Sequence, residues 1–193
     1  SELARELVRS NRQGLRFLAV EYGKKQAMER AYFAYVISSL GVPSEQSHDT
    51  LSEILLQYLT NSTVFCRENV LHALYTRGGE QAVEHALEII SENGWYHSPK
   101  LLSDGLPSFN GDQHALVRRL WARRNQWEEC ILVGIIQFAS SLPGEEHAEA
   151  FLEALEREPL PIMPLMPCSN RYFAKPAPMR MDVSNSSRSR RSP

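Results

Sequence analysis

Four glycines recur along this sequence at nearly constant intervals, and their spacing constrains the fold more than any other feature. The intervals are 37, 33 and 33 residues, and the glycines are Gly41, Gly78, Gly111 and Gly144. An alanine lies four residues after each of the last three. Intervals in the thirties that hold two short helices are typical of an α-solenoid, in which antiparallel helix pairs stack and share a continuous core.

The segments between the glycines have the periodicity of helices. Apolar residues lie three and four positions apart in four segments, residues 51–59, 68–75, 82–90 and 114–121. This spacing places them on one face of a helix. Acidic residues such as Glu80 and Asp112 follow the glycines, where they face the positive end of a helix dipole. We find no convincing alternating strand, so the sequence predicts an all-α fold.

Two of the segments share a pattern of arginine, apolar residues and a final glycine. The first is "CRENVLHALYTRGG" (residues 66–79), with Arg67, Ala73, Leu74 and Gly78. The second is "ERAYFAYVISSLG" (residues 29–41), with Arg30, Leu40 and Gly41. Both resemble the second helix of a HEAT repeat, whose usual form is V-R-x-A-A-x-x-A-L-x-x-L-G. The resemblance covers residues 20–157, and "SPKLLSDGLPSFNGD" is similar to HEAT-repeat proteins of Gram-positive bacteria.

The resemblance implies a right-handed α-solenoid of about four HEAT-like antiparallel helix pairs. It also implies that Arg30 and Arg67 form hydrogen bonds or carboxylate pairs between repeats. Each lies eleven residues before a repeat glycine, and Lys100 holds the same position before Gly111. Such solenoids bind partners along the concave surface lined by their second helices. We therefore expect a monomeric, non-catalytic scaffold for a protein or peptide partner.

The phase of the repeats assigns eight residues to that concave face. They are Tyr32, Tyr35, Glu68, Asn69, His72, Lys100, Asp104 and Gln137. The set combines aromatic, charged and amide side chains, so it suits a polar protein surface better than an apolar ligand or a polyanion. We predict no catalytic residue, no cofactor and no metal ligand.

The alternative is a HEAT-like enzyme of the bilin lyase, DNA glycosylase or di-iron hydroxylase type, with its site on the concave face. Two acid–histidine pairs, Glu84-His85 and Glu146-His147, bear on the di-iron class. In both pairs the acid precedes the histidine, whereas di-iron hydroxylases have the histidine first and need four such pairs. Adjacent residues of a helix also point about 100° apart, so neither pair can chelate a metal by itself. We interpret them as solvated residues. A deep pocket with converging polar groups would favour an enzyme, and a shallow groove the scaffold.

Nucleic-acid binding is disfavoured despite several arginines near tryptophans. The basic residues of that region are Arg118, Arg119, Arg123 and Arg124. They spread around their helix, and residues 1–158 carry a formal charge of about −7, which opposes phosphate binding. We expect Trp95 and Trp127 to close the turns after first helices, and Cys66 and Cys130 to lie in the core.

The stretch from Ser98 to Phe109 contains serine-hydrolase look-alikes. Ser98 and Lys100 are one residue too close for an S-x-x-K motif. A helix explains the stretch better, with Ser98 as N-cap and Pro99 at its first position. Its core stripe is Leu102, Leu106 and Phe109. Lys100 and Asp104 then form an outer i,i+4 pair, and Pro107 is expected to distort the end of the helix.

The composition changes abruptly after Glu158. Seven of the eleven prolines lie in residues 159–193, and that segment has a formal charge of +5. We predict a helical repeat domain over 1–158 and an irregular or disordered tail over 159–193. The tail is a possible non-specific contact with a membrane. The three cysteines are far apart and lack a C-x-x-C pair, which favours a reducing compartment. We expect a cytoplasmic location, or the cytoplasmic face of a membrane if an anchor precedes residue 1.

Overall fold

The computed structural model describes residues 11–44 and 49–144, and within these ranges every regular element is helical. The chain divides into two units, Ser1–Pro161 and Ile162–Pro193, and every described residue belongs to the first. The described elements are α2 (Arg12–Gly23), α3 (Ala27–Leu40), α4 (Thr50–Gln57), α5 (Val64–Arg77), α6 (Glu80–Glu92), α7 (Pro99–Gly105), η1 (Leu106–Ser108), α8 (Gln113–Ala122), η2 (Arg124–Gln126) and α9 (Glu129–Ser141). The predicted all-α class is confirmed. The predicted tail, 159–193, and the part of the predicted repeat domain that follows Gly144 lie outside the described residues.

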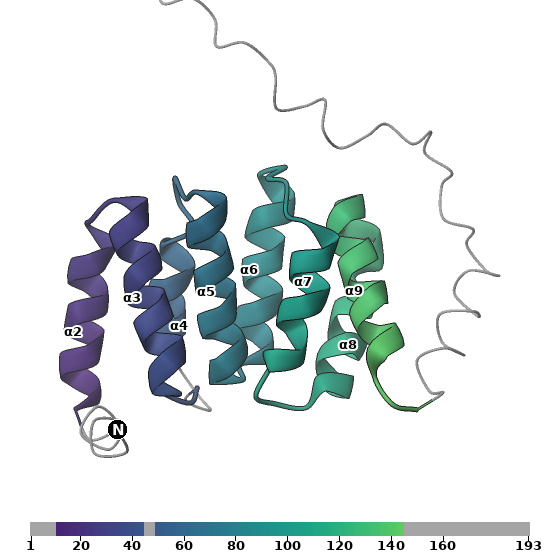
Figure 1. The fold of residues 1–193 in the computed structure, drawn as a ribbon, viewed down its shortest axis with the longest axis horizontal. Helices are drawn as coiled ribbons and strands as arrows, with labels where there is room; N and C mark the ends of the chain where they lie inside the picture. The colour runs from purple at the N-terminus through teal and green to yellow at the C-terminus, as the bar shows by residue number, and fades with distance from the viewer. Residues whose placement is uncertain (1–10, 45–48, 145–193) are drawn as a thin grey trace, which may run out of the picture. The chain divides into compact units, whose positions relative to one another are not determined.

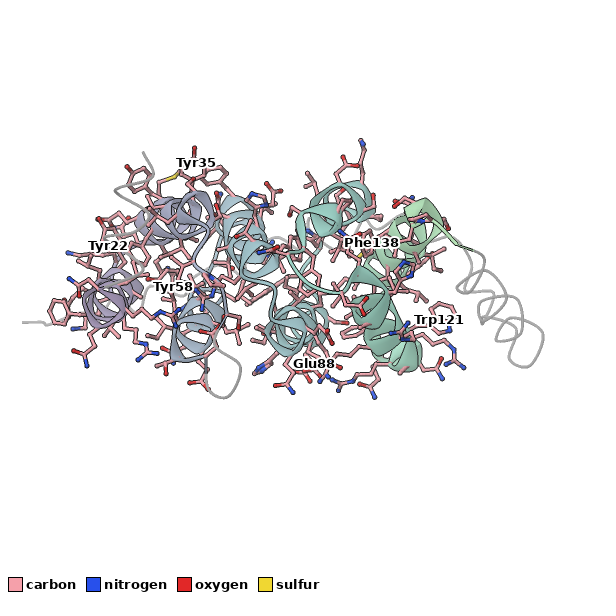
Figure 2. All side chains as sticks on the ribbon, turned by 90° about the horizontal axis from the view of Figure 1, so that it is seen from below. Tyr22, Tyr35, Tyr58, Glu88, Trp121 and Phe138 are labelled. Carbon is pink, nitrogen blue, oxygen red and sulfur yellow. The ribbon has the colours of Figure 1, made fainter. Side chains whose placement is uncertain are left out.

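Consecutive helices alternate between two rows (Figures 1 and 2). One row, here called the second-helix row, contains α3, α5, α7 and α9. The other, the first-helix row, contains α2, α4, α6 and α8. Each helix packs on its neighbours in the same row, and contacts across the rows join α2 to α3, α4 to α5, α5 to α6 and α8 to α9. The apolar stripes therefore meet between the rows, as expected for short amphipathic helices that cannot bury their apolar faces alone.

The core between the rows consists mainly of aliphatic side chains, with two tyrosines, Tyr58 and Tyr75, and a few other aromatic residues. Ile37, Leu74 and Leu87 are fully buried, and so is Tyr58. The Tyr58 hydroxyl donates a 2.5 Å hydrogen bond to the carbonyl of Ala19. A buried hydroxyl without a partner would cost free energy, so this bond allows a tyrosine inside the α2–α4 contact.

Two of the repeated glycines end second helices, whereas Gly111 and Gly144 lie in the segments that follow η1 and α9. Gly41 and Gly78 close α3 and α5 in the left-handed conformation, with φ of 59° and 79°. Glycine is preferred there because a side chain is strained at positive φ. At Gly111 the reason is space, since an added Cβ would lie 2.7 Å from the Phe109 ring. The repeated glycines therefore share a position, at the junctions between helix pairs, but they do not share one backbone conformation.

The inter-repeat hydrogen bonds predicted for Arg30 and Arg67 are present. Arg30 donates to the carbonyls of Thr60 and Asn61 at 2.9 and 3.1 Å, in the turn before α5. Arg67 donates to the carbonyl of Tyr96 at 3.5 Å, in the turn before α7, and to that of Ser62 at 3.1 Å. Both side chains are buried, so α3 and α5 are each joined to the turn of the next helix pair.

Lys100 is not equivalent to these arginines, although it has the same distance to its glycine. Arg30 and Arg67 are the fourth residues of α3 and α5, whereas Lys100 is the second residue of α7. Its side chain is 80% exposed and pairs with Asp104 at 2.7 Å. The reason is Pro107, which shortens α7 and replaces its last turn with the 3₁₀ helix η1. The predicted distortion at Pro107 and the buried stripe of Leu102, Leu106 and Phe109 are confirmed.

One interpretation of a single residue is wrong. Glu84 was expected on a solvated face, but it is buried and forms ion pairs with Arg119 and with Arg123 (the latter 3.2 Å). The cause is α8, which packs on α6 and brings both arginines over the carboxylate. Of the two cysteines expected in the core, Cys66 is fully buried and Cys130 is half-buried and packed against the core.

The two turn tryptophans behave as expected. Trp127 is buried after α8, and its indole N–H donates to the carbonyl of Leu120 at 2.8 Å. Trp95 follows α6, half-buried, with the Arg67 guanidinium 5.3 Å from its ring centre.

Candidate binding surface

The eight residues assigned to the concave face all lie on helices of the second-helix row. Tyr32 and Tyr35 lie on α3 and are 62% and 56% exposed. On α5, His72 is exposed, whereas Glu68 and Asn69 are half-buried. The other three, Lys100, Asp104 and Gln137, are exposed on α7 and α9. The phase of the repeats therefore selected solvent-accessible positions, and their role in binding stays a prediction.

An apolar groove of about 810 Å³ lies at the α3–α5 end of this row. We call it the aromatic groove, and its lining residues are Tyr22, Met28, Glu29, Ala31, Tyr32, Tyr35, Phe65 and Asn69. The Tyr22 ring stacks on Phe33, with ring centres 4.7 Å apart. That contact ties the α2 side of the groove to α3. Tyr35 projects from α3 at the outer edge of the molecule (Figure 2).

Five of the eight groove residues were not among the predicted set, namely Tyr22, Met28, Glu29, Ala31 and Phe65. Among these, Met28 and Phe65 are large apolar side chains that are 66% and 52% exposed. Met28, Tyr32 and Tyr35 are spaced i, i+4, i+7, which makes a second apolar stripe on α3, opposite its core stripe. The sequence signal was present: α3, AMERAYFAYVISSL, is apolar on nearly all sides. One end of the row is therefore apolar, whereas the predicted set combined aromatic, charged and amide side chains.

The charges of α3 and α5 are divided between the interior and the surface. Their three cations, Arg30, Arg67 and Arg77, are all buried. Their two anions, Glu29 and Glu68, are exposed and half-buried respectively. Glu29 also accepts a hydrogen bond from the backbone N–H of Gln26 at 3.1 Å in a capping box. The solvent-facing charge around the aromatic groove is therefore negative on these two helices.

Arg77 is held by a buried network on the side of α5 that faces α4. It forms an ion pair with Asp49 and donates to Ser52 Oγ and the carbonyl of Val42 at 3.1 and 3.0 Å. Burial raises the pKa of Asp49, but hydrogen bonds from Arg77, Ser44 and Ser52 outweigh it and hold that pKa below its ordinary value. Asp49 therefore stays ionised and fixes the α4–α5 contact.

The α7 end of the row exposes an ion pair and hydroxyl groups beside Leu101. Lys100 Nζ and Asp104 form the exposed ion pair already described. The Ser103 hydroxyl donates to the carbonyl of Lys100 at 3.1 Å. Ser108 Oγ lies 3.3 Å from His72 Nδ1 and 2.6 Å from the carbonyl of Gly105. The hydroxyls of Ser103 and Ser108 therefore donate to backbone carbonyls of the same segment.

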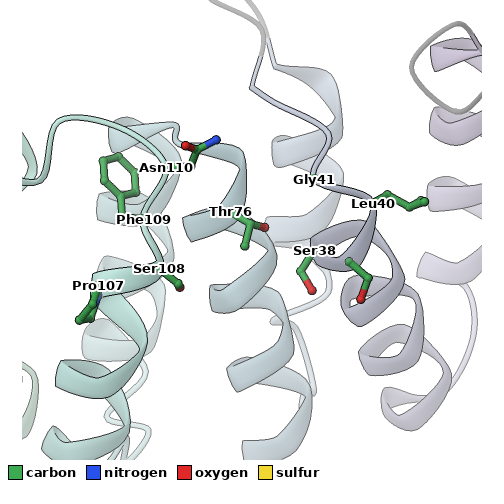
Figure 3. A pocket seen from close by; sticks show the side chains of 9 residues that line it. Ser38, Leu40, Gly41, Thr76, Pro107, Ser108, Phe109 and Asn110 are labelled. Carbon is green, nitrogen blue, oxygen red and sulfur yellow. The ribbon is translucent and has the colours of Figure 1, made fainter. Parts of the chain in front are cut away.

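A second hollow of about 500 Å³ lies beside the end of α3. Figure 3 shows its walls, formed by the end of α3, by Thr76 and by the segment from Pro107 to Asn110. The hydroxyls of Ser38 and Ser39 donate to the carbonyl of Tyr35, at 2.8 and 2.9 Å. Thr76 donates to carbonyls of its own helix. No charged residue is among the nine that line it, so this hollow lacks the converging ionisable groups of a catalytic pocket.

His97 is the buried histidine between α6 and α7, and it is only 2% exposed. Burial lowers its pKa to about 4, and the nearby Arg67 charge acts in the same direction. Its Nδ1 atom has no hydrogen-bond partner among the described residues. It is therefore neutral near pH 7 and forms part of the packing rather than of the exposed face.

Metal and membrane sites were also sought in the described part of the chain. No group of three or more His, Cys, Asp or Glu side chains in residues 11–44 and 49–144 is placed to hold a metal ion. None of the helices in those ranges combines the length and apolar character needed to cross a membrane.

No protein-family model, curated protein or solved structure matches this chain.

Proposed function

We propose that this protein is a non-catalytic scaffold that binds a protein or peptide partner along the exposed face of its second-helix row. In this proposal the helix pairs form a right-handed HEAT-like solenoid of about four units, and the exposed face is the concave one. The observation that carries the proposal is the aromatic groove, an apolar surface left open on a row that also exposes polar side chains such as His72, Lys100 and Asp104. An exposed apolar patch with a polar surround is typical of an interaction site.

The way the row is built supports this function. Arg30 and Arg67 join successive helix pairs through backbone carbonyls, so the second helices are held side by side by bonds that lie beneath the surface. Their outer side chains are then free to contact a partner. A rigid, preformed surface favours binding because less conformational entropy is lost on association.

The features of the hollows favour a scaffold over an enzyme. The aromatic groove has one carboxylate, Glu29, and that group caps its own helix. The hollow beside α3 has no ionisable group. Catalytic sites place converging ionisable groups with shifted pKa values around the substrate. No observation specifically favours an enzymatic alternative.

A capture experiment tests the proposal. The full chain would be immobilised beside a variant with Tyr35→Ala, Glu68→Ala, His72→Ala and Asp104→Ala, and each exposed to lysate. A matched control carries Phe17→Ala, Glu53→Ala, His85→Ala and Glu92→Ala, four exposed residues of the first-helix row.

The expected result is a partner retained by wild type and control and lost by the second-helix variant. Retention of the same partners by all three proteins would contradict the assignment of this face. Circular dichroism melts of the three proteins establish that each is folded.

A further inference from the structure

We propose that the aromatic groove binds a proline-rich peptide segment that carries a lysine or arginine. This inference rests on the proposed function and names the chemistry of the partner at one end of the second-helix row. It follows from three properties of the groove, namely its aromatic walls, its unused hydroxyl donors and its negative rim.

The walls of the groove are mainly rings. Four of its eight lining residues are aromatic, namely Tyr22, Tyr32, Tyr35 and Phe65. Flat, rigid side chains of this kind match the pyrrolidine rings and the preformed polyproline II helix of a proline-rich segment, which loses little entropy on binding. An aliphatic groove would lack this match.

The hydroxyl groups favour an extended partner over a helical one. Those of Tyr32 and Tyr35 make no hydrogen bond within residues 11–44 and 49–144, and both side chains are more than half exposed. They are available as donors. A polyproline II segment has free carbonyls along its length, whereas the interior carbonyls of a helix are already bonded.

The rim of the groove selects a positive charge. Glu29 lines it, and Glu68 lies one helical turn from Phe65 on the same side of α5. The arginines of both helices are buried and are bonded to other groups. A lysine or arginine beside the prolines would meet a carboxylate, and an acidic partner would be repelled.

Fluorescence anisotropy with the full chain tests the inference. The probe is a labelled synthetic peptide with proline at every second or third position, leucines between the prolines and one terminal arginine. Two further peptides serve as controls, one with each proline replaced by alanine and one with the arginine replaced by glutamate. The protein variants are the double variant Tyr32→Ala with Tyr35→Ala, then Glu68→Lys, and Phe17→Ala as an exposed aromatic of α2 outside the groove.

The proline peptide is expected to give saturable binding to wild type and to Phe17→Ala. Its Kd should rise roughly tenfold or more for the Tyr32→Ala, Tyr35→Ala double variant, because two aromatic contacts are lost. It should rise several-fold for Glu68→Lys, and the alanine and glutamate peptides should bind more weakly than the probe.

Three results would overturn the inference: no saturable binding to wild type, equal binding of the alanine peptide, or an unchanged Kd for the double variant. If one of these results is found and the four-residue variant of the second-helix row still loses a captured partner, the proposed scaffold function stands but its partner is not proline-rich. If that four-residue variant also retains its partners, the proposed function fails as well.

Discussion

The α3–α5 and α7–α9 halves of the second-helix row follow one glycine period but are held together differently. On α3 and α5 the fourth residue is a buried arginine, whose guanidinium reaches carbonyls of the next turn. On α7 the fourth residue is Leu102, which is fully buried. Leu102 packs directly against Gly134 of α9, where an added Cβ would lie 2.8 Å from its side chain.

This difference determines the character of the exposed face. In the first half all the arginines are buried, so the charged side chains left at the surface of α3 and α5 are carboxylates, beside exposed aromatic rings. In the second half the cation, Lys100, remains in solvent with Asp104. The buried arginines therefore stabilise the α3–α5 contact and at the same time leave an apolar, negative surface above it.

The largest expected effect concerns the buried Arg77–Asp49 pair. Arg77→Met should destabilise the protein by about 3–5 kcal/mol, because it leaves the Asp49 carboxylate buried without its cation. Urea unfolding monitored by circular dichroism measures the change. Lys100→Met breaks the exposed pair of α7 and should change stability by no more than about 0.5 kcal/mol. Equal losses for the two variants would contradict the contrast between buried and exposed pairs.

The next effect is a pH dependence that originates at His97, at the junction of the two halves. Its folded-state pKa of about 4 lies below its ordinary value of 6.5. The unfolded chain therefore binds a proton first as the pH falls. Stability should be full above pH 6.5 and should decrease by about 3 kcal/mol between pH 6.5 and 4.

Urea unfolding at a series of pH values gives this slope. In His97→Leu the free energy of unfolding should depend less steeply on pH between pH 6.5 and 4, because the proton taken up by this histidine on unfolding is lost. Asp49 provides an internal comparison. Its pKa in the folded protein lies below the ordinary value of 3.8, so the stability that its ion pair contributes is lost only below about pH 3.8. An unchanged slope in His97→Leu would exclude this histidine as the source.

The smallest of the three effects tests the close packing of α7 on α9. Gly134→Ala should lower stability by about 1–2 kcal/mol, because overpacking against Leu102 exceeds the gain in helix propensity. Ser140→Ala, an exposed site on the same helix, should be nearly neutral. Thermal melts compare the two. Stabilisation by Gly134→Ala would show that α7 and α9 do not approach as closely as described.

Periodicity was sufficient to predict the helices, and several contacts followed from it. The segments 51–59, 68–75, 82–90 and 114–121 coincide with α4, α5, α6 and α8. Arg30 and Arg67 could be predicted because their positions repeat. The burial of Glu84 could not, since it depends on Arg119 and Arg123, which lie 35 and 39 residues away. A pattern within one helix does not reveal such a partner.

The aromatic groove was predicted only in part. Tyr32 and Tyr35 followed from the phase of the repeats, but Met28 and Phe65 did not. A single sequence gives the spacing of apolar residues without showing which stripe faces the core. On α3 both stripes are apolar, and only the packing of α2 and α5 around it shows which one remains exposed.

The most direct test of the central claim compares the two halves as binding sites. The partner captured by wild type would be titrated by calorimetry against the Tyr32→Ala, Tyr35→Ala variant and against a Lys100→Ala, Asp104→Ala variant. Binding through the aromatic groove predicts that the first variant loses roughly tenfold or more in affinity and that the second changes much less. A greater loss for the Lys100→Ala, Asp104→Ala variant, or unchanged affinity for both, would contradict it.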